Sequence, residues 1–189
     1  MSLSWAWQTA FRCANYRDML RSFLFAILAF LVTAPASAEV VVTFWSHDRD
    51  QNYQHAFLTM RGRIDASGEA VDTNIGFTAQ MASPLVLLGS VAGRMEVLSP
   101  GYVARATSRP HFALRLNDAQ YARLTAFIAS WRGQRSGYNL NRRNCVHFIM
   151  EAAATFGLEV NRRSAFFRAP GDFLNEVMRL NPTLVQVTR

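Results

Sequence analysis

Residues 138–149 read YNLNRRNCVHFI, and this stretch decides which fold the chain predicts. Asn144 is a favoured N-cap residue, and the apolar positions that follow it recur at helical spacing until Gly157, so a helix is expected from Cys145 to about residue 156. Cys145 then stands in the first turn of that helix. Backbone N–H groups are free there and the helix end is positive, so we expect the thiolate of Cys145 to be favoured and its pKa to be low.

Short apolar and alternating segments precede this helix. Segments 40–45, 53–60, 70–77, 93–98 and 102–116 predict strands, with a turn at 100–101. Helical spacing predicts a further helix from residue 117 or 118 to 132, while Pro84 begins a short helix and Pro170 begins a last one that ends near residue 181. The fold class is therefore α/β in the broad sense and α+β more narrowly, with a small, mainly antiparallel sheet packed against the Cys145 helix.

The first 38 residues have the pattern of an export signal. Arg12, Arg17 and Arg21 precede the apolar stretch 23–32, and the small residues 36–38 fit a cleavage site. The stretch is shorter than the roughly 20 residues that span a bilayer comfortably. We therefore predict a signal peptide over 1–38 and one mature domain over 39–189, periplasmic or secreted. An uncleaved N-terminal anchor is the alternative.

Composition narrows the classes of partner. The net charge is +7, and all 20 basic residues are arginine. The acidic residues are scattered and no long basic run occurs, which argues against a nucleic-acid partner and leaves peripheral contact with an anionic envelope surface open. The histidines and cysteines lack metal-ligand spacing, and no Gly-rich phosphate loop is present, so neither a metal nor another cofactor is expected.

Cleavage after residue 38 would remove Cys13 and leave Cys145 as the only cysteine. The count alone allows a buried residue, an intermolecular link or a reactive thiol. A nucleophilic cysteine needs a base, usually histidine. His147 cannot serve, because two helical residues place it about 200° away from Cys145. Spacing leaves His47, His55 and His111 open, with His55 foremost.

The segment 144–148, Asn-Cys-Val-His-Phe, resembles the Asn-Cys-Glu-His-Phe motif of lecithin retinol acyltransferase-like proteins, a branch of the circularly permuted NlpC-type papain-like hydrolases. In that family a strand histidine, a polar residue on the next strand and a helix-opening cysteine follow in this order. Here His55, then Asp72 or Asn74, then Cys145 do the same, and the resemblance covers about residues 55–157. It departs at Val146, which replaces the motif's glutamate, and in the lack of a second histidine on the 70–77 strand.

The resemblance implies a papain-like fold in which Cys145 is the nucleophile and His55 the general base. Asp72 would orient the imidazole, with Asn74 as the alternative on the same strand face. The backbone N–H of Cys145 would supply part of an oxyanion site, and Tyr138 is the candidate for a second donor.

Arg142 and Arg143 are candidate substrate contacts, although arginines of a loop are also commonly solvated. The reaction expected from the resemblance is acyl transfer through a thioester, on a peptide or amide of the cell wall or envelope. Two alternatives stay open. One is a lipid esterase or acyltransferase, and the other is an envelope-binding module that has the fold without catalysis.

Overall fold

The computed structural model describes residues 39–47, 54–81, 84–133 and 137–184. The chain divides between Ser37 and Ala38, and all the described residues belong to the second unit, Ala38–Arg189. The predicted signal peptide, including Cys13, lies outside the described residues. Across the segments that are described, no helix combines the length and the apolar character needed to cross a membrane.

A five-stranded sheet forms the centre of the second unit. Its strands are β1 (Val40–His47), β2 (His55–Arg63), β3 (Ala70–Ala79), β4 (Gly93–Val97) and β5 (Ser108–Leu116). Their order is β4-β3-β2-β1-β5, and each neighbouring pair is antiparallel. Consecutive strands therefore lie side by side except where β5 returns to the free edge of β1. The predicted α+β class with an antiparallel sheet is confirmed.

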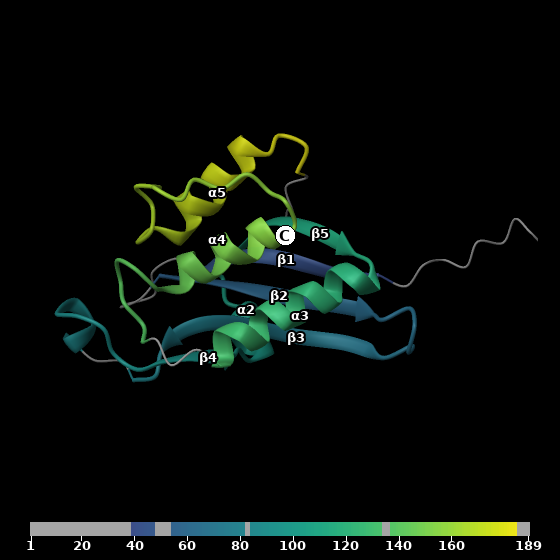
Figure 1. Cartoon of the computed structure of the whole chain (residues 1–189), viewed down its shortest axis with the longest axis horizontal. Helices are drawn as coiled ribbons and strands as arrows, with labels where there is room; N and C mark the ends of the chain where they lie inside the picture. The colour runs from purple at the N-terminus through teal and green to yellow at the C-terminus, as the bar shows by residue number, and fades with distance from the viewer. Residues whose placement is uncertain (1–38, 48–53, 82–83, 134–136, 185–189) are drawn as a thin grey trace, which may run out of the picture. The chain divides into compact units, whose positions relative to one another are not determined.

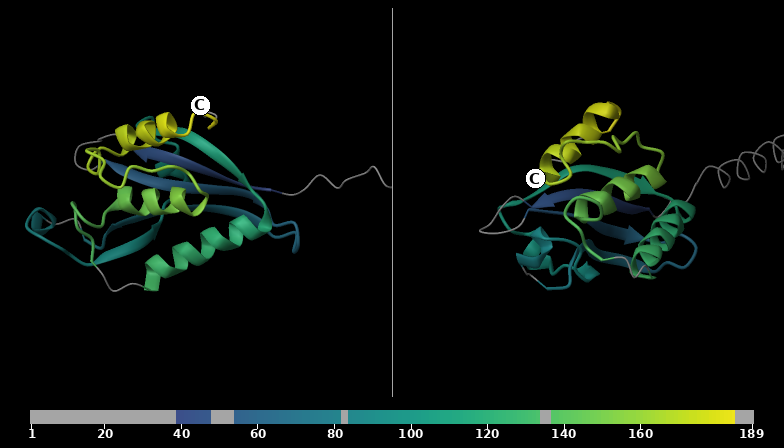
Figure 2. Two further views of the ribbon diagram at one scale, coloured as in Figure 1. Left: turned by 45° about the horizontal axis from the view of Figure 1, so that its top comes forward. Right: turned by 60° about the vertical axis from the view of Figure 1, so that its left-hand side comes forward.

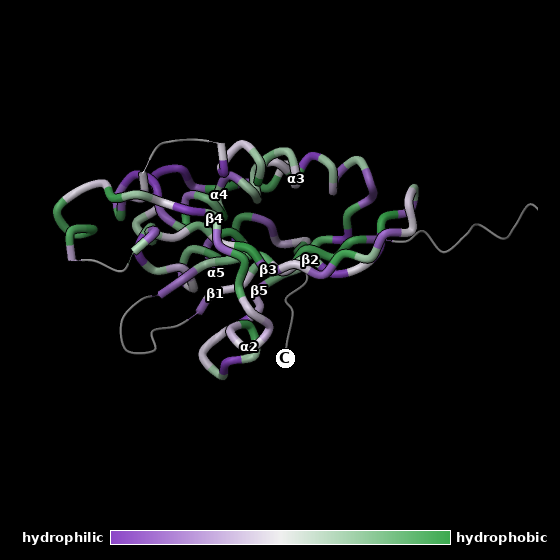
Figure 3. Tube along the Cα trace, turned by 90° about the horizontal axis from the view of Figure 1, so that it is seen from below, coloured by the Kyte–Doolittle hydropathy of each residue, from purple (hydrophilic) through white to green (hydrophobic). Residues whose placement is uncertain are grey.

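Helices cover the two faces of this sheet unequally. The longer helices α3 (Asp118–Gly133), α4 (Cys145–Thr155) and α5 (Pro170–Leu180) lie on one face (Figures 1 and 2). The short helix α2 (Pro100–Val103) lies on the opposite side (Figure 3). A single 3₁₀ turn, η1 (Pro84–Leu87), connects β3 to β4.

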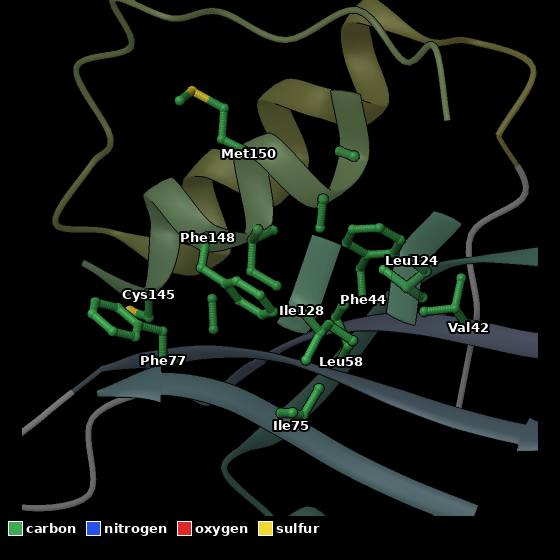
Figure 4. Close-up of a cluster of buried hydrophobic side chains, with 14 of the residues drawn as sticks. Val42, Phe44, Leu58, Ile75, Phe77, Leu124, Ile128, Cys145, Phe148 and Met150 are labelled. Atoms are coloured by element: carbon green, nitrogen blue, oxygen red, sulfur yellow. The ribbon is translucent and has the colours of Figure 1, made fainter. Parts of the chain in front are cut away.

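The main core fills the space between the sheet and the three long helices. Alternation along the strands directs Phe44, Leu58 and Ile75 toward α4, and each is at most 1% exposed (Figure 4). Burying each such side chain contributes about 1.5–3 kcal/mol. α4 is buried on more than one side, because α3 and α5 flank it and the side that faces the sheet packs on β2 and β3. Its N-terminal residue, Cys145, is thereby fixed at one end of the sheet.

The sequence prediction was wrong over residues 100–107, where it expected a turn and then a strand. Ser99 accepts a hydrogen bond from the backbone N–H of Tyr102, and Pro100 occupies the first helical turn, so the chain forms α2. The strand β5 begins only at Ser108. As a result, the ring of Tyr102 contacts the rings of His47, His55 and Phe57 on the face away from α4.

Candidate functional site at the N-terminal end of α4

The start of α4 is held by Asn144. Its side-chain oxygen accepts hydrogen bonds from the backbone N–H groups of Val146 (2.9 Å) and His147 (3.2 Å), as expected of an N-cap. Its amide nitrogen donates to the carbonyl oxygens of Leu140 and Phe167, both at 2.7 Å. One buried side chain thus ties the preceding loop, the later 167 segment and the helix together, and it fixes the position of Cys145.

The sulfur of Cys145 meets backbone N–H groups of Ala56, Val146 and Cys145 itself, and all three lower the pKa of the thiol. Burial acts in the opposite direction and is stronger, so the pKa of Cys145 is raised to about 11. The expectation of a low pKa is therefore corrected: the helix end favours the thiolate as expected, but the loss of solvent outweighs it. Cys145 is a neutral thiol at neutral pH.

Two adjoining hollows meet at this end of the sheet. Cys145 lines a cavity of about 560 Å³, together with residues such as Asn144 and Phe167. His55 lines a second cavity, of about 270 Å³. The two share the same four wall residues, which are Gln54, Val86, Tyr138 and Leu140. The thiol and the imidazole therefore face neighbouring spaces with a common wall.

His55 is the first residue of β2, and its ring is enclosed by packing. A Cβ atom added to Gly76 of β3 would lie 2.5 Å from Nε2, and the ring of Tyr102 presents its edge at 6.4 Å between centroids. Nε2 is buried and has no hydrogen-bond partner among the described residues. Burial, and secondarily the nearby His47, lower the pKa of His55 to about 4. The imidazole is therefore neutral at neutral pH.

Cys145 and His55 both lie near the N-terminal end of β2, but their side chains do not contact each other through a hydrogen bond. Alternation points Ala56 toward the helices, in the same core as Cys145, and points His55 with Phe57 toward the opposite face. The N–H of Ala56 nevertheless reaches the sulfur, so the thiol lies beside the residue that follows His55. Within the described chain, no hydrogen bond links the sulfur to the ring. The resting state is a neutral thiol and a neutral imidazole, not an ion pair.

The predicted orienting role of Asp72 and Asn74 is corrected by the strand register. Asn74 lies opposite Thr59 and Asp72 opposite Arg61, which are four and six residues from His55. At about 3.3 Å per residue these separations are about 13 and 20 Å. Asp72 forms an ion pair with Arg61 at 2.8 Å. Neither side chain can hold the imidazole.

Asn74 has a structural role instead. Its side-chain oxygen accepts from Arg61 at 2.7 Å, and its amide donates to the Leu98 carbonyl at 3.1 Å. These bonds satisfy a buried amide and attach the end of β4 to the middle of the sheet.

Tyr138 lines both cavities, as a residue of the predicted site would. Its backbone N–H is bonded to the Val91 carbonyl at 2.7 Å, so an oxyanion contact from Tyr138 would have to come from its hydroxyl. Its ring packs on Phe77, with centroids 5.7 Å apart. Figure 4 shows Phe77 beside Cys145 in the core. Tyr138 therefore forms the wall between the hollows.

The two arginines before the helix differ. Arg142 is exposed on the loop. The Arg143 guanidinium lies 3.7 Å from the centroid of the Trp131 ring and 5.2 Å from that of Phe77. This cation–π stack points Arg143 into the protein between α3 and β3, and neither arginine lines the Cys145 cavity. Their predicted role as substrate contacts is not supported by these positions, and Arg168 is the arginine that lines the cavity.

The remaining imidazoles are engaged elsewhere. His147 bonds to Asn144 through Nδ1 at 2.8 Å and stacks on Phe167 with ring centroids 4.4 Å apart, so it helps to cap α4 rather than acting on the sulfur. Nδ1 of His47 contacts the Ser108 hydroxyl, and Nε2 of His111 contacts the Ser46 hydroxyl, each at 2.9 Å.

Sequence reasoning missed three contributors: the Ala56 N–H, the ring of Tyr102 and the small residue Gly76. The register of the β2–β3 hairpin could have revealed Gly76. Arg63 pairs with Ala70, and counting back along β2 and forward along β3 brings Gly76 opposite Phe57, diagonal to His55. No comparable signal identifies Tyr102, because its position depends on the unpredicted helix α2.

No family model, curated protein or solved structure matches the chain. In the part of the chain that is described, no group of three or more His, Cys, Asp or Glu side chains is placed to hold a metal ion.

Proposed function

We propose that this protein is a cysteine-dependent acyl-transfer enzyme of papain-like type, a hydrolase that forms a thioester on Cys145. The observation that carries the proposal is the setting of the sulfur. It stands at the N-terminal end of α4, receives three backbone N–H groups and lines a cavity of about 560 Å³. Backbone N–H groups at such a place can also stabilise the oxygen of a tetrahedral intermediate.

The chemistry follows from the neutral pair. As the sulfur attacks a substrate carbonyl carbon, the thiol proton must pass to a base, and the unprotonated ring of His55 can accept it. Gly76 closes off Nε2, which leaves Nδ1 as the nitrogen through which the ring would act. The S–C bond forms, the carbonyl oxygen gains negative charge, and the leaving group departs with the proton. Water then cleaves the thioester, which regenerates the thiol.

A closing movement is part of this proposal. The sulfur and the ring are not hydrogen-bonded in the free protein, and catalytic hydrogen bonds commonly tighten only with substrate bound. Substrate bound in either cavity would contact Gln54, which lines both cavities and immediately precedes His55. Packing, rather than a third polar residue, would hold the imidazole.

The substrate class is proposed from the export signal and the family resemblance, and it is an amide or peptide of the cell envelope. The lipid alternative is supported by the apolar part of the cavity wall, which consists of Val86, Leu87, Leu140 and Phe167. An ester of a long acyl chain would fit such a wall better than a charged peptide would.

A second candidate is a binding module without turnover. Two observations favour it: the pKa of Cys145 is about 11, and Nε2 of His55 lacks the polar partner that orients a catalytic imidazole. In that case the cavities would hold a ligand and the thiol would be a core residue.

Hydrolysis of activated substrates separates these candidates. Purified protein would be assayed with p-nitrophenyl esters of short and long acyl chains and with aminocoumarin amides of peptides. We expect release that is lost in Cys145→Ser and falls at least about 100-fold in His55→Gln, the scale of general-base catalysis. His111→Gln, a buried imidazole on β5, is the matched control and keeps its activity. Equal release by wild type and Cys145→Ser rejects the enzymatic proposal.

A further inference from the structure

An apolar tip projects beside the two cavities. It comprises Met81, Leu85, Leu87 and Leu88, which are 60–85% exposed although they are large aliphatic residues. Figure 3 displays this segment as a hydrophobic loop extending from one end of the domain. Clustered exposure of this kind marks an interaction surface.

The tip is held in place by contacts with residues that line the two cavities. Val86, in the middle of η1, is 7% exposed and belongs to the wall of both cavities. Just after the tip, Val91 forms a backbone bridge with Tyr138, and the Asn139 side chain donates to the Ser90 hydroxyl at 3.1 Å. The tip is therefore held against the loop that leads into α4.

One exposed cation lies at the mouth of the Cys145 cavity, and a second lies on the loop beside it. Arg168 is exposed, lines the Cys145 cavity and donates to Asn141 at 2.6 Å. Arg142 is exposed on the same loop as Asn141. The chain as a whole carries a net charge of +7. An apolar projection next to exposed cations is the arrangement that inserts into a lipid interface and attracts anionic headgroups.

We propose that this tip docks on an anionic lipid bilayer and turns the mouth of the Cys145 cavity toward the membrane surface. A protein partner fits less well, because three of the four exposed residues are leucine, which is under-represented among protein hot spots. The docking does not depend on turnover by Cys145. A failure of the catalytic proposal therefore leaves it standing, and the reverse holds as well.

The test places a polarity-sensitive dye on the tip of the full chain. Leu88→Cys is labelled in a background of Cys13→Ser and Cys145→Ser, and Ser67→Cys in the β2–β3 turn, at the other end of β2, is the matched control. The same N-terminal segment is present in both proteins, so its own affinity for membranes does not distinguish them. Vesicles of phosphatidylcholine are compared with vesicles that also contain phosphatidylglycerol.

We expect the dye at position 88 to shift to the blue on the anionic vesicles and the dye at position 67 to stay unchanged. Added salt reduces the shift, since the arginines act through screened charge. Leu85→Ser and Leu87→Ser, each made in the protein labelled at position 88, weaken the tip-dependent affinity at least about tenfold, from the transfer energy of one leucine. Val97→Ser, an exposed apolar residue of β4 outside the tip, has little effect.

Equal shifts at positions 88 and 67, or no shift at position 88 with either vesicle, overturn the proposal. If the chain instead self-associates in solution and Leu88→Ser abolishes that association, the tip binds a second copy of the chain and the lipid assignment is wrong.

Discussion

The reactivity of Cys145 toward iodoacetamide follows directly from its burial. Alkylation proceeds through the thiolate, so its rate follows the ionised fraction. The pKa of Cys145 is about 11 against an ordinary 9.0. At pH 7 the thiolate fraction is then about 10⁻⁴ instead of about 10⁻², which makes Cys145 about 100-fold less reactive than an unperturbed thiol.

The assay uses Cys13→Ser, so that Cys145 is the only cysteine, and follows labelling by mass spectrometry between pH 7 and pH 10. We expect the rate to rise about tenfold per pH unit without a plateau. Limited access to the sulfur would lower every rate equally and leave this slope unchanged. His55→Gln should leave the slope unchanged as well, because a neutral imidazole does not stabilise the thiolate by charge.

A plateau below about pH 8, or rapid labelling at pH 7 that slows in His55→Gln, is incompatible with a raised pKa of Cys145. Either result would mean that the two groups form an ion pair in the free protein, and that burial at the start of α4 does not control the thiol.

Three further outcomes are expected. The pKa of His55 is about 4 in the folded protein and 6.5 ordinarily, so the unfolded chain binds the proton more tightly. The free energy of unfolding should therefore fall by up to about 3 kcal/mol as the pH drops from 6.5 to 4. Urea titrations of His55→Gln should lack this pH-dependent loss. Gly76→Ala places a Cβ 2.5 Å from the His55 ring and should lower the free energy of unfolding by about 1–3 kcal/mol. Gly89→Ala, whose Cβ meets nothing within 4 Å, should leave that free energy unchanged. Arg143→Ala should cost about 1 kcal/mol of stability by losing its cation–π stack, while Arg142→Ala, a change on the exposed loop, leaves the urea midpoint unchanged.

Local patterns in the sequence were sufficient for most of the fold. Asn144 and Gly157 bracket α4, and Pro170 begins α5, because caps and prolines act through the backbone of their own neighbourhood. The strands followed from apolar alternation. The prediction for residues 100–107 failed because Ser99 and Pro100, which were interpreted as part of a turn, also satisfy the requirements of a helix start.

The candidate site was less accessible to sequence reasoning. The sequence identified Cys145 at a helix end and His55 on a strand, but it could not reveal that burial would reverse the expected pKa of the thiol. That pKa depends on how completely α3, α5 and the sheet exclude water around α4, which is a property of the assembled core. The prediction of a residue that orients His55 failed for a different reason, since Asp72 and Asn74 were chosen by residue type and not by hairpin register.

In the proposed reaction, Cys145 carries an acyl group as a thioester. The most direct measurement is peptide mapping by mass spectrometry after the chain is mixed with an activated ester and quenched in acid. We expect one added acyl group on the Cys145 peptide. Neutral hydroxylamine should remove it, as it removes a thioester, and His55→Gln should diminish it. Ester turnover without any acyl group on Cys145, or the same adduct in Cys145→Ala, would contradict the proposed thioester.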